Sequence, residues 1–208
     1  MIGIIDLEIC NLKSIQSAIY NLGYDFKLIN KKKILNFDDI SHLLIPGVGS
    51  FSNISKEYFS EQEFNTNLQS FVKSGKPVLG ICLGMHFLSK KGNENGINPG
   101  LNLVDATVDI MVSDKSRNFN LPHVGWNEIE IVKEHKIFSN IKNKCNFYFV
   151  HSYQMNLNDQ KYCFAKTKYL ENFTSVVINE NIVGFQFHPE KSSKNGLKIL
   201  ENFLKWRP

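Results

Sequence analysis

The sequence has no long apolar run, no paired cysteines and no strong excess of one charge. No stretch of its 208 residues approaches the roughly 18–20 apolar residues that a membrane-spanning helix needs. The N-terminus does not resemble a signal peptide, and the four cysteines form no CxxC pair. These absences exclude membrane insertion and a disulfide framework, and we expect a reduced, cytoplasmic protein.

Charge and histidine spacing argue against nucleic-acid and metal partners. The chain carries 24 Lys and Arg against 20 Asp and Glu, and its longest basic run is Lys31–Lys33. A solvated loop explains so short a run, with attraction to an acidic partner surface as the alternative. Four histidines lack the i, i+4 spacing of helical metal ligands: His42, His123, His135 and His151. No GxGxxG motif follows the first apolar run, so a dinucleotide cofactor is not supported. From these three observations together we expect no metal, no cofactor and no nucleic-acid partner.

Short apolar segments alternate with amphipathic ones through the first half of the chain. Buried strands are expected at Ile2–Asp6, Phe26–Ile29, Leu43–Ile45 and Val78–Ile81. Helices are expected at Asn11–Leu22, which Gly23 ends, at Gln62–Lys73 and after Cys82. Such alternation predicts a parallel sheet that is covered by helices on both faces.

The second half of the chain has shorter strand-like segments and a final helix. Strands are expected at Thr107–Met111, Glu128–Val132, Phe147–Val150, Tyr162–Lys166 and Ser175–Asn179. Asn93–Gly100 is expected to be a surface loop and Gly196–Lys205 a helix. The expected fold class is α/β, a three-layer, mostly parallel open sheet with antiparallel additions. With 42% hydrophobic residues, the chain can form a single domain over residues 1–208.

A cysteine stands where a buried strand is predicted to turn into a helix. Residues 80–86 read GICLGMH, so Gly80 and Gly84 flank Cys82. The glycines give the backbone freedom of a sharp turn and let a substrate approach the main chain. Free N–H groups at a helix start favour the thiolate over the thiol. Cys82 is therefore the candidate nucleophile, although a buried structural cysteine in a tight turn has the same local pattern.

A histidine and a carboxylate follow an apolar strand near the C-terminus. Residues 182–190 read IVGFQFHPE, and in an extended segment His188 and Glu190 point the same way. The histidine can take the thiol proton and pass it to a leaving group, while the carboxylate fixes its tautomer. A surface His-Pro-Glu at a strand end is the alternative, and only the fold can bring His188 to Cys82.

A third segment supplies free main-chain N–H groups. Residues 42–51 read HLLIPGVGSF, an apolar strand that runs into the turn Gly47-Val48-Gly49. With the amide of Leu83, this turn can form a two-donor oxyanion hole, whose single donors are typically worth about 2.7–4 kcal/mol. An ordinary strand-to-helix loop is the alternative.

In this order, these segments resemble the class I glutamine amidotransferases, in which a Cys-His-Glu triad hydrolyses the side-chain amide of glutamine. Further stretches resemble the glutaminase subunit of imidazole glycerol phosphate synthase, which pairs with a TIM-barrel cyclase. They are PGVGSF at 46–51, LPHVGWNEI at 121–129, FYFVHSY at 147–153 and GFQFHPEKSS at 184–193. The resemblance covers essentially the whole chain.

The resemblance implies roles for individual residues. It makes Cys82 the nucleophile, His188 the general base and acid, and Glu190 the residue that orients His188. Gly47, Val48, Gly49 and Leu83 are implied in the oxyanion turn, and Gly49, His86, His151, Ser152 and Tyr153 in holding glutamine. The implied side facing the cyclase contains Asn11, Trp126, Asn127, Tyr148 and Lys191.

The sequence departs from the family pattern at two places. The family usually has glutamine where this chain has His86, and an imidazole is shorter than that amide, with one donor and one acceptor. Leu7–Asn11 reads LEICN, where the family commonly has an aromatic residue and glycines before the asparagine. These departures bear on glutamine binding and on the choice of partner.

The resemblance implies that ammonia passes to a cyclase in a heterodimer that makes imidazole glycerol phosphate and an aminoimidazole carboxamide ribonucleotide for histidine biosynthesis. Two alternatives stay open. One is a paralogous glutaminase that supplies ammonia to a sugar-amidinating enzyme of surface-polysaccharide or flagellin glycan synthesis. The other is a non-catalytic binding subunit whose glutamine pocket has changed at His86. A cysteine peptidase or amidase on a related sheet lacks support from the HPE pattern.

Overall fold

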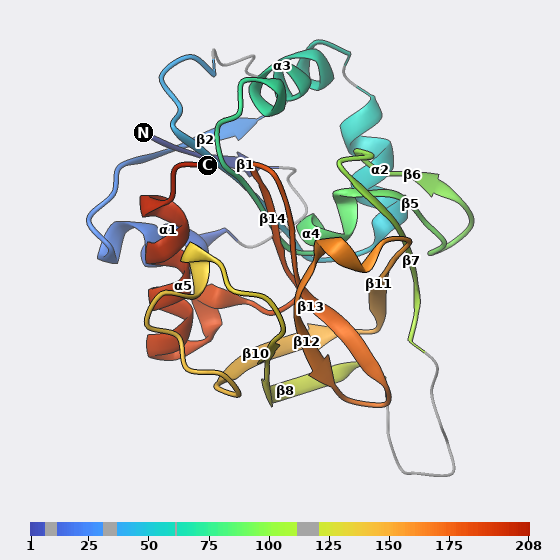
Figure 1. Ribbon diagram of the computed structural model, residues 1–208. Coiled ribbons are helices and arrows are strands. Elements are labelled where there is room, and N and C mark those ends of the chain that lie inside the picture. The colour runs from blue at the N-terminus through green and yellow to red at the C-terminus, as the bar shows by residue number, and fades with distance from the viewer. Residues whose placement is uncertain (7–11, 31–36, 61, 112–120) are drawn as a thin grey trace.

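The computed structural model describes residues 1–6, 12–30, 37–60, 62–111 and 121–208 (Figure 1). The expectations for Leu7–Asn11, which include Asn11 at the partner side, and for Lys31–Lys33 lie outside the described residues. Within the described part of the chain, no helix is long and apolar enough to cross a membrane.

An eight-stranded sheet forms the centre of the molecule, in the order β2-β1-β3-β4-β14-β13-β12-β9. Its first five strands run parallel: β1 (Ile2–Asp6), β2 (Phe26–Asn30), β3 (His42–Gly47), β4 (Val78–Cys82) and β14 (Ile182–Phe185). Three antiparallel strands extend it: β13 (Asn172–Asn179), β12 (Cys163–Lys168) and β9 (Glu130–Ile131). The mostly parallel sheet with antiparallel additions is confirmed.

Two smaller sheets flank the central one. A two-stranded ribbon pairs β8 (His123–Glu128) with β10 (Asn146–His151). A four-stranded sheet contains β11 (Tyr153–Leu157), β7 (Val104–Ile110), β5 (Ser89–Gly92) and β6 (Asn98–Pro99). The segment expected as one strand from 128 to 132 is divided between β8 and β9, which belong to different sheets.

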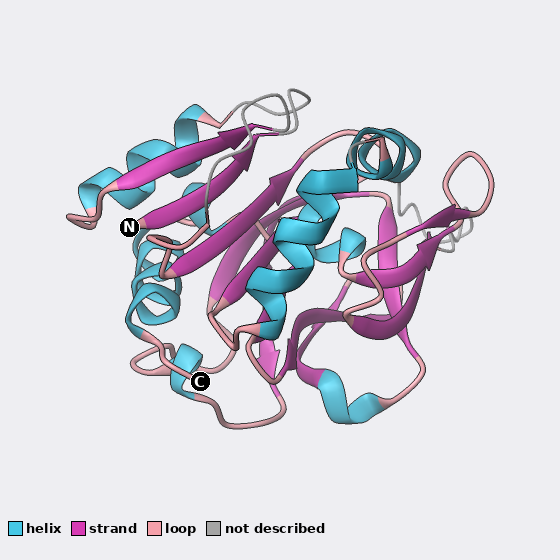
Figure 2. Ribbon diagram, turned by 90° about the horizontal axis from the view of Figure 1, so that it is seen from above, coloured by secondary structure: helices cyan, strands magenta, loops and turns pink. Residues whose placement is uncertain are grey.

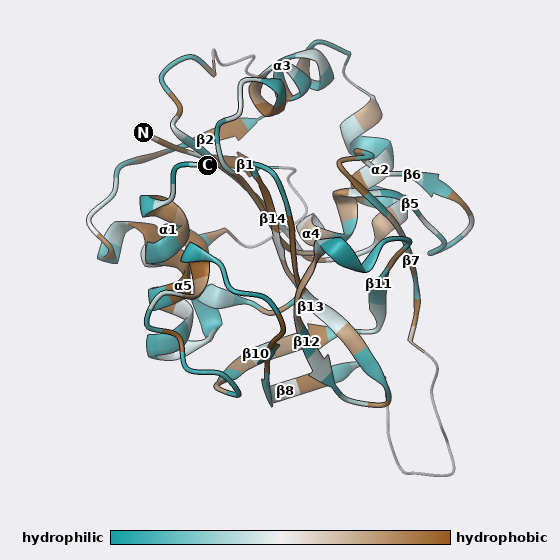
Figure 3. Cartoon of the chain, viewed as in Figure 1, coloured by the Kyte–Doolittle hydropathy of each residue, from teal (hydrophilic) through white to brown (hydrophobic). Residues whose placement is uncertain are grey.

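Helices cover both faces of the central sheet (Figure 2). They are α1 (Lys13–Asn21), α2 (Phe51–Phe59), α3 (Gln62–Lys73), α4 (Leu83–Phe87) and α5 (Ser193–Lys205). Successive residues of a strand point to opposite faces, so Ile4 packs with α1 and α5 while Ile5 packs with α2 and α3. Figure 3 shows the apolar colouring concentrated on the central strands and the inner sides of these helices.

Two local predictions differ from the structure. Helix α2 was not expected; Ser50 caps it by accepting a hydrogen bond from the Asn53 amide, at 3.4 Å, and Phe51 and Ile54 are buried. The 93–100 segment is not only a surface loop, because Asn98–Pro99 pairs with β5. The expected end of the first helix is confirmed, since Gly23 follows the cap residue Leu22 with φ of +81°.

The parallel strands bring the sequence motifs to one edge of the sheet. Gly47 at the end of β3 is in register with Cys82 at the end of β4. Phe185 at the end of β14 is in register with Ile81, so the chain leaves β14 toward His188 on the same edge. Open α/β sheets bind ligands at this carboxyl edge.

Candidate active site

The turn at Cys82 leaves no room for a Cβ atom at its neighbouring glycines. Cys82 ends β4 and precedes α4, with φ of +52° and ψ of −108°, a conformation that a residue with a side chain rarely adopts. A Cβ on Gly84 would lie 1.7 Å from the carbonyl oxygen of Ile45, and one on Gly47 would lie 2.8 Å from the Gly84 nitrogen. The two glycines therefore let α4 press against β3 and hold the cysteine in its strained position.

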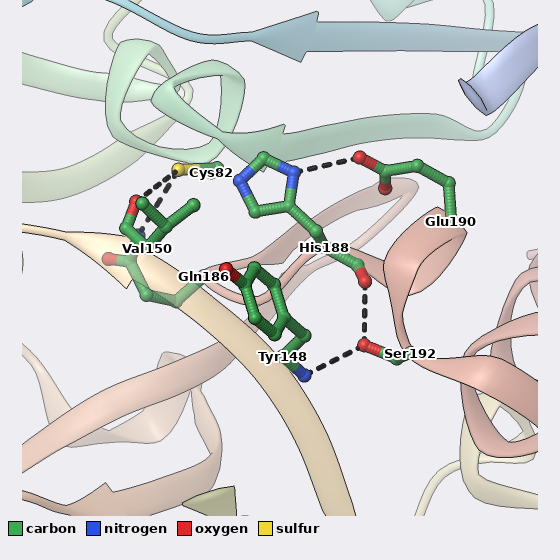
Figure 4. A network of polar contacts seen from close by, with 7 residues as sticks. All are labelled: Cys82, Tyr148, Val150, Gln186, His188, Glu190 and Ser192. Carbon is green, nitrogen blue, oxygen red and sulfur yellow. Dashed lines mark hydrogen bonds and ion pairs between the residues drawn. The ribbon is translucent and has the colours of Figure 1, made fainter. Parts of the chain in front are cut away.

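His188 lies between the cysteine and a carboxylate (Figure 4). Its Nδ1 contacts Glu190 Oε1 at 2.8 Å, and both side chains are buried. The pairing was predicted for an extended segment, but residues 189–191 form a 3-10 turn, η4 (Pro189–Lys191), which brings Glu190 back to the ring. The other ring nitrogen, Nε2, is buried without a hydrogen-bond partner in the described structure, and it is on the side of the ring that faces Cys82.

The electrostatic environment of His188 favours the protonated ring. Burial alone would lower its pKa, but the Cys82 sulfur and the Glu190 carboxylate outweigh burial and raise that pKa to about 10. His188 is therefore an imidazolium at neutral pH.

Strand β10 is hydrogen-bonded to the Cys82 side chain and to the backbone of His188. The Val150 carbonyl accepts from Cys82 Sγ at 3.7 Å. The Tyr148 carbonyl accepts from the His188 amide at 2.9 Å, and the Tyr148 amide donates to Ser192 Oγ at 2.9 Å. Ser192 Oγ in turn donates to the His188 carbonyl at 2.6 Å. These bonds attach the backbone of His188 to β10, the strand whose Val150 carbonyl accepts from Cys82 Sγ (Figure 4).

Gln186 is a site residue that sequence reasoning missed. Its Nε2 donates to Cys82 Sγ at 3.9 Å, and its Oε1 lies 2.6 Å from His86 Nε2. Burial lowers the pKa of His86 to about 4, despite the opposing hydrogen bond that its ring donates to Gln186 Oε1, so this ring is neutral at pH 7. A fully buried amide within the apolar run IVGFQF was the available signal.

A cavity of about 190 Å³ opens beside the sulfur. Its lining contains most of the residues expected at the oxyanion turn and the glutamine site: Val48, Gly49, Cys82, Leu83, His86, His151, Ser152 and Tyr153, together with Glu94 and Val150. Gly47 lies behind it, against Gly84. The Leu83 amide belongs to the first residue of α4 and has no carbonyl one turn earlier in the helix. Small-molecule sites combine such an enclosed space with a few polar groups.

Glu94 was also missed, because its segment was expected to be a surface loop. The carboxylate Oε2 accepts from the Phe51 amide at 2.5 Å, which fixes the side chain at the cavity wall. It is the one carboxylate among the described residues that line the cavity. Glu94 thus places a carboxylate in the wall of the cavity that Cys82 also lines.

The residues expected at the partner side separate onto two faces of the β8–β10 ribbon. Trp126 is 54% exposed and its ring lies 6.1 Å from that of Tyr148, its register partner, while Lys191 is exposed nearby in η4. Asn127 instead faces inward, where its Nδ2 donates to the Lys168 carbonyl at 3.0 Å. The part of the chain that the structure describes contains no cluster of three or more His, Cys, Asp or Glu suited to a metal ion.

Known proteins share both the sequence pattern and the fold. The family model described as glutamine amidotransferase class-I matches residues 3–206. The imidazole glycerol phosphate synthase subunit HisH of Sulfurimonas denitrificans is 39% identical over 208 residues, covering 100% of this chain and 99% of that protein. The same-named subunit of Caldanaerobacter subterraneus subsp. tengcongensis is 39% identical over 204 residues, covering 98% and 97%.

A solved structure gives the same result for the fold. The structure of PurLQS from Thermotoga maritima covers 98% of this chain and 96% of its own with a TM-score of 0.74, at 15% identity. That likeness confirms the α/β architecture expected from the sequence. Since the family model spans nearly every residue, and full-length relatives exceed a third in identity, the chain belongs to the class-I glutamine amidotransferases, an enzyme family.

Proposed function

We propose that this chain is the glutaminase subunit of an imidazole glycerol phosphate synthase. It hydrolyses glutamine and passes the ammonia to a cyclase subunit in histidine biosynthesis. The observation that carries the chemistry is the buried imidazole of His188, held at Nδ1 by Glu190 and facing Cys82 with an unpaired Nε2. The full-length similarity to subunits of that name supports the pathway.

The reaction follows from the order of these groups. The Cys82 sulfur attacks the side-chain carbonyl carbon of glutamine, forming a C–S bond as the carbonyl electron pair moves to oxygen. His188 then gives its Nε2 proton to the amide nitrogen, the C–N bond breaks, and ammonia leaves. Water next loses a proton to His188 and its oxygen attacks the thioester carbon, the C–S bond breaks, and glutamate leaves as the Cys82 thiolate and the protonated His188 are restored.

The developing oxyanion is bound by main-chain N–H groups. The Leu83 amide directly follows Cys82 at the start of α4, and Val48, Gly49 and Leu83 line the cavity together with Cys82. Gly49 has φ of +106°, so it can take up a backbone orientation that a residue with a side chain would resist. Such donors act mainly on the transition state, in which the negative charge is largest.

Delivery to a partner explains the exposed Trp126 and its half-buried neighbour Tyr148. Ammonia in water at neutral pH is mostly ammonium, which is not a nucleophile, so the product must pass directly to an acceptor site. Trp126 and Tyr148 pack edge to face on the outer side of the ribbon. The backbone of Tyr148 is bonded to His188 and Ser192, so a partner on this face would lie next to the catalytic histidine.

Growth of a histidine auxotroph that lacks its own glutaminase subunit tests the pathway. We expect this chain, expressed with the host's cyclase or with the cyclase of a relative that it resembles, to restore growth without added histidine. Failure to restore growth, with active glutamine hydrolysis in the purified chain and its copurifying partner, would assign the ammonia to another acceptor, such as a sugar-amidinating enzyme.

Glu94 is positioned to bind the α-ammonium group of glutamine. Removing the negative charge should weaken ground-state binding, so Glu94→Gln is expected to raise the KM for glutamine about 10- to 100-fold. This change corresponds to the loss of about 1.5–3 kcal/mol of binding free energy, the usual value for a charged hydrogen bond. The change in kcat should be small, because the group lies away from the reacting carbonyl. Steady-state kinetics of the complex measure both values. Glu63→Gln, on the exposed surface of α3, is the matched control, and an equal KM for the two variants would refute this role.

A further inference from the structure

We propose that Asn127 and His123 are positioning residues that fix the tautomer and the place of His151 in the wall of the glutamine cavity. This inference rests on the proposed function only in taking that cavity as the substrate site. In this proposal Asn127 has a structural role inside the protein and does not contact a partner. The proposal also assigns to His151 a part in shaping the cavity through its neighbours.

The proton arrangement is set at one end by a main-chain carbonyl. His151 Nδ1 lies 2.8 Å from the Tyr153 carbonyl oxygen, which can only accept, so this nitrogen carries the hydrogen. In the neutral ring, Nε2 must then be the acceptor. His123 Nδ1 lies 3.1 Å from that nitrogen and must donate to it. His123 Nε2 is left as an acceptor in turn.

Main-chain groups also set the other end. Asn127 Nδ2 lies 3.3 Å from His123 Nε2 and 3.0 Å from the Lys168 carbonyl, while its Oδ1 accepts from the Glu128 amide at 2.8 Å. The orientation of this side-chain amide is therefore fixed by two backbone partners. Every hydrogen bond is therefore donated in the same direction, from Asn127 through both rings to the Tyr153 carbonyl. If any donor and acceptor were exchanged, a hydrogen bond at one end of the chain of bonds would be lost.

Packing keeps both rings neutral and in place. His123 is 2% exposed and stacks between Tyr169, at 4.0 Å between ring centroids, and Phe149, at 5.0 Å. Burial lowers the pKa of His123 to about 4. Burial, together with the nearby histidines His86, His123 and His188, lowers the pKa of His151 to about 3 against the opposing bond to Tyr153.

The chain of bonds fixes the corner between β10 and β11. Both ring nitrogens of His151 are committed to protein atoms, so the ring offers the cavity a surface rather than a hydrogen bond. Its Nδ1–H holds the Tyr153 carbonyl, while the Met111 amide holds the Ser152 carbonyl at 2.9 Å. Ser152 and Tyr153 line the cavity, so the shape of this wall depends on the side-chain amide of Asn127, which lies on β8 four residues after His123 and on the same face of the strand.

Nitrogen NMR of the full chain tests the proton arrangement directly. We expect His123 and His151 to be neutral at pH 7 and both to carry the proton on Nδ1, the tautomer that imidazole adopts less often in water. This readout needs neither activity nor a partner, so it stands apart from the proposed function. Finding the proton on Nε2 of either ring, or a charged ring in the wild-type chain, would overturn the inference.

A charge-matched pair of variants tests the consequence for the substrate. Asn127→Asp keeps the acceptor for the Glu128 amide but replaces the donor by a carboxylate oxygen, which recruits a proton to His123 Nε2. We expect NMR to show a charged His123. We also expect the KM for glutamine to rise about tenfold with kcat within about twofold, because the disturbed buried hydrogen bonds shape the binding cavity and do not touch the reacting atoms. Asn146→Asp, at the exposed start of β10, makes the same charge change and should match the wild type. Equal KM values for the two variants would contradict the proposal.

Discussion

Replacing Cys82 by alanine removes the nucleophile, and the expected result is a fall in kcat for glutamine hydrolysis of about 10⁴- to 10⁶-fold. In the proposed reaction the sulfur forms the covalent bond to the substrate, and alanine has no group that could replace it. Glutamate release by the chain with its partner measures the effect. The side chain is small and the turn is set by Gly84 and Gly47, so the fold should survive the change.

Cys145→Ala is the matched control for this variant. Cys145 is a free, half-buried cysteine that does not line the cavity, so its removal should leave the rate within about twofold of the wild type. Similar rates for Cys82→Ala and Cys145→Ala would show that the site beside α4 does not carry the reaction. A non-catalytic subunit would then be the better description of the chain.

His188→Asn is expected to lower kcat about 10²- to 10⁴-fold, the usual contribution of a positioned acid and base. In the proposed reaction the imidazole protonates the leaving nitrogen and then deprotonates water, and an amide side chain can do neither. The defect should appear in both kcat and kcat/KM, because glutamine binding does not depend on the proton.

His135→Asn separates this effect from the general loss of a histidine. His135 caps η2 (Lys136–Phe138) by accepting from the Ile137 amide at 3.2 Å, and asparagine performs the same capping function well. This control should therefore keep wild-type kinetics. A rate for His188→Asn that equals that of His135→Asn would exclude the assigned proton transfer.

The catalytic turn could be predicted because its chemistry is local. Strand composition followed by Gly80-Ile81-Cys82-Leu83-Gly84 specifies a strand, a sharp turn and a helix, and the structure has β4 and α4 at these positions. The spacing of the apolar residues placed α3 at Gln62–Lys73, as found. Parallel strands share one carboxyl edge, so the meeting of the three motifs there followed from the fold class.

The rest of the site depends on contacts that spacing does not encode. Glu94 reaches the cavity only because α2 offers it the Phe51 amide, and α2 itself was not expected. Gln186 contacts the sulfur because α4 places His86 against its amide. Asn127 and Trp126 are adjacent in the sequence, and only the pleat of the β8–β10 ribbon shows that they face opposite ways.

The titration of His188 tests most directly whether the imidazole and the sulfur interact. The sulfur and Glu190 raise the pKa of His188 to about 10 against the effect of burial. In wild-type protein, the NMR signal of this ring should therefore remain that of the imidazolium through neutral pH and change only near pH 10. In Cys82→Ala, burial is opposed by Glu190 alone, so the change should move to lower pH. An ordinary value near 6.5 in the wild type, or the same value with and without Cys82, would contradict the account.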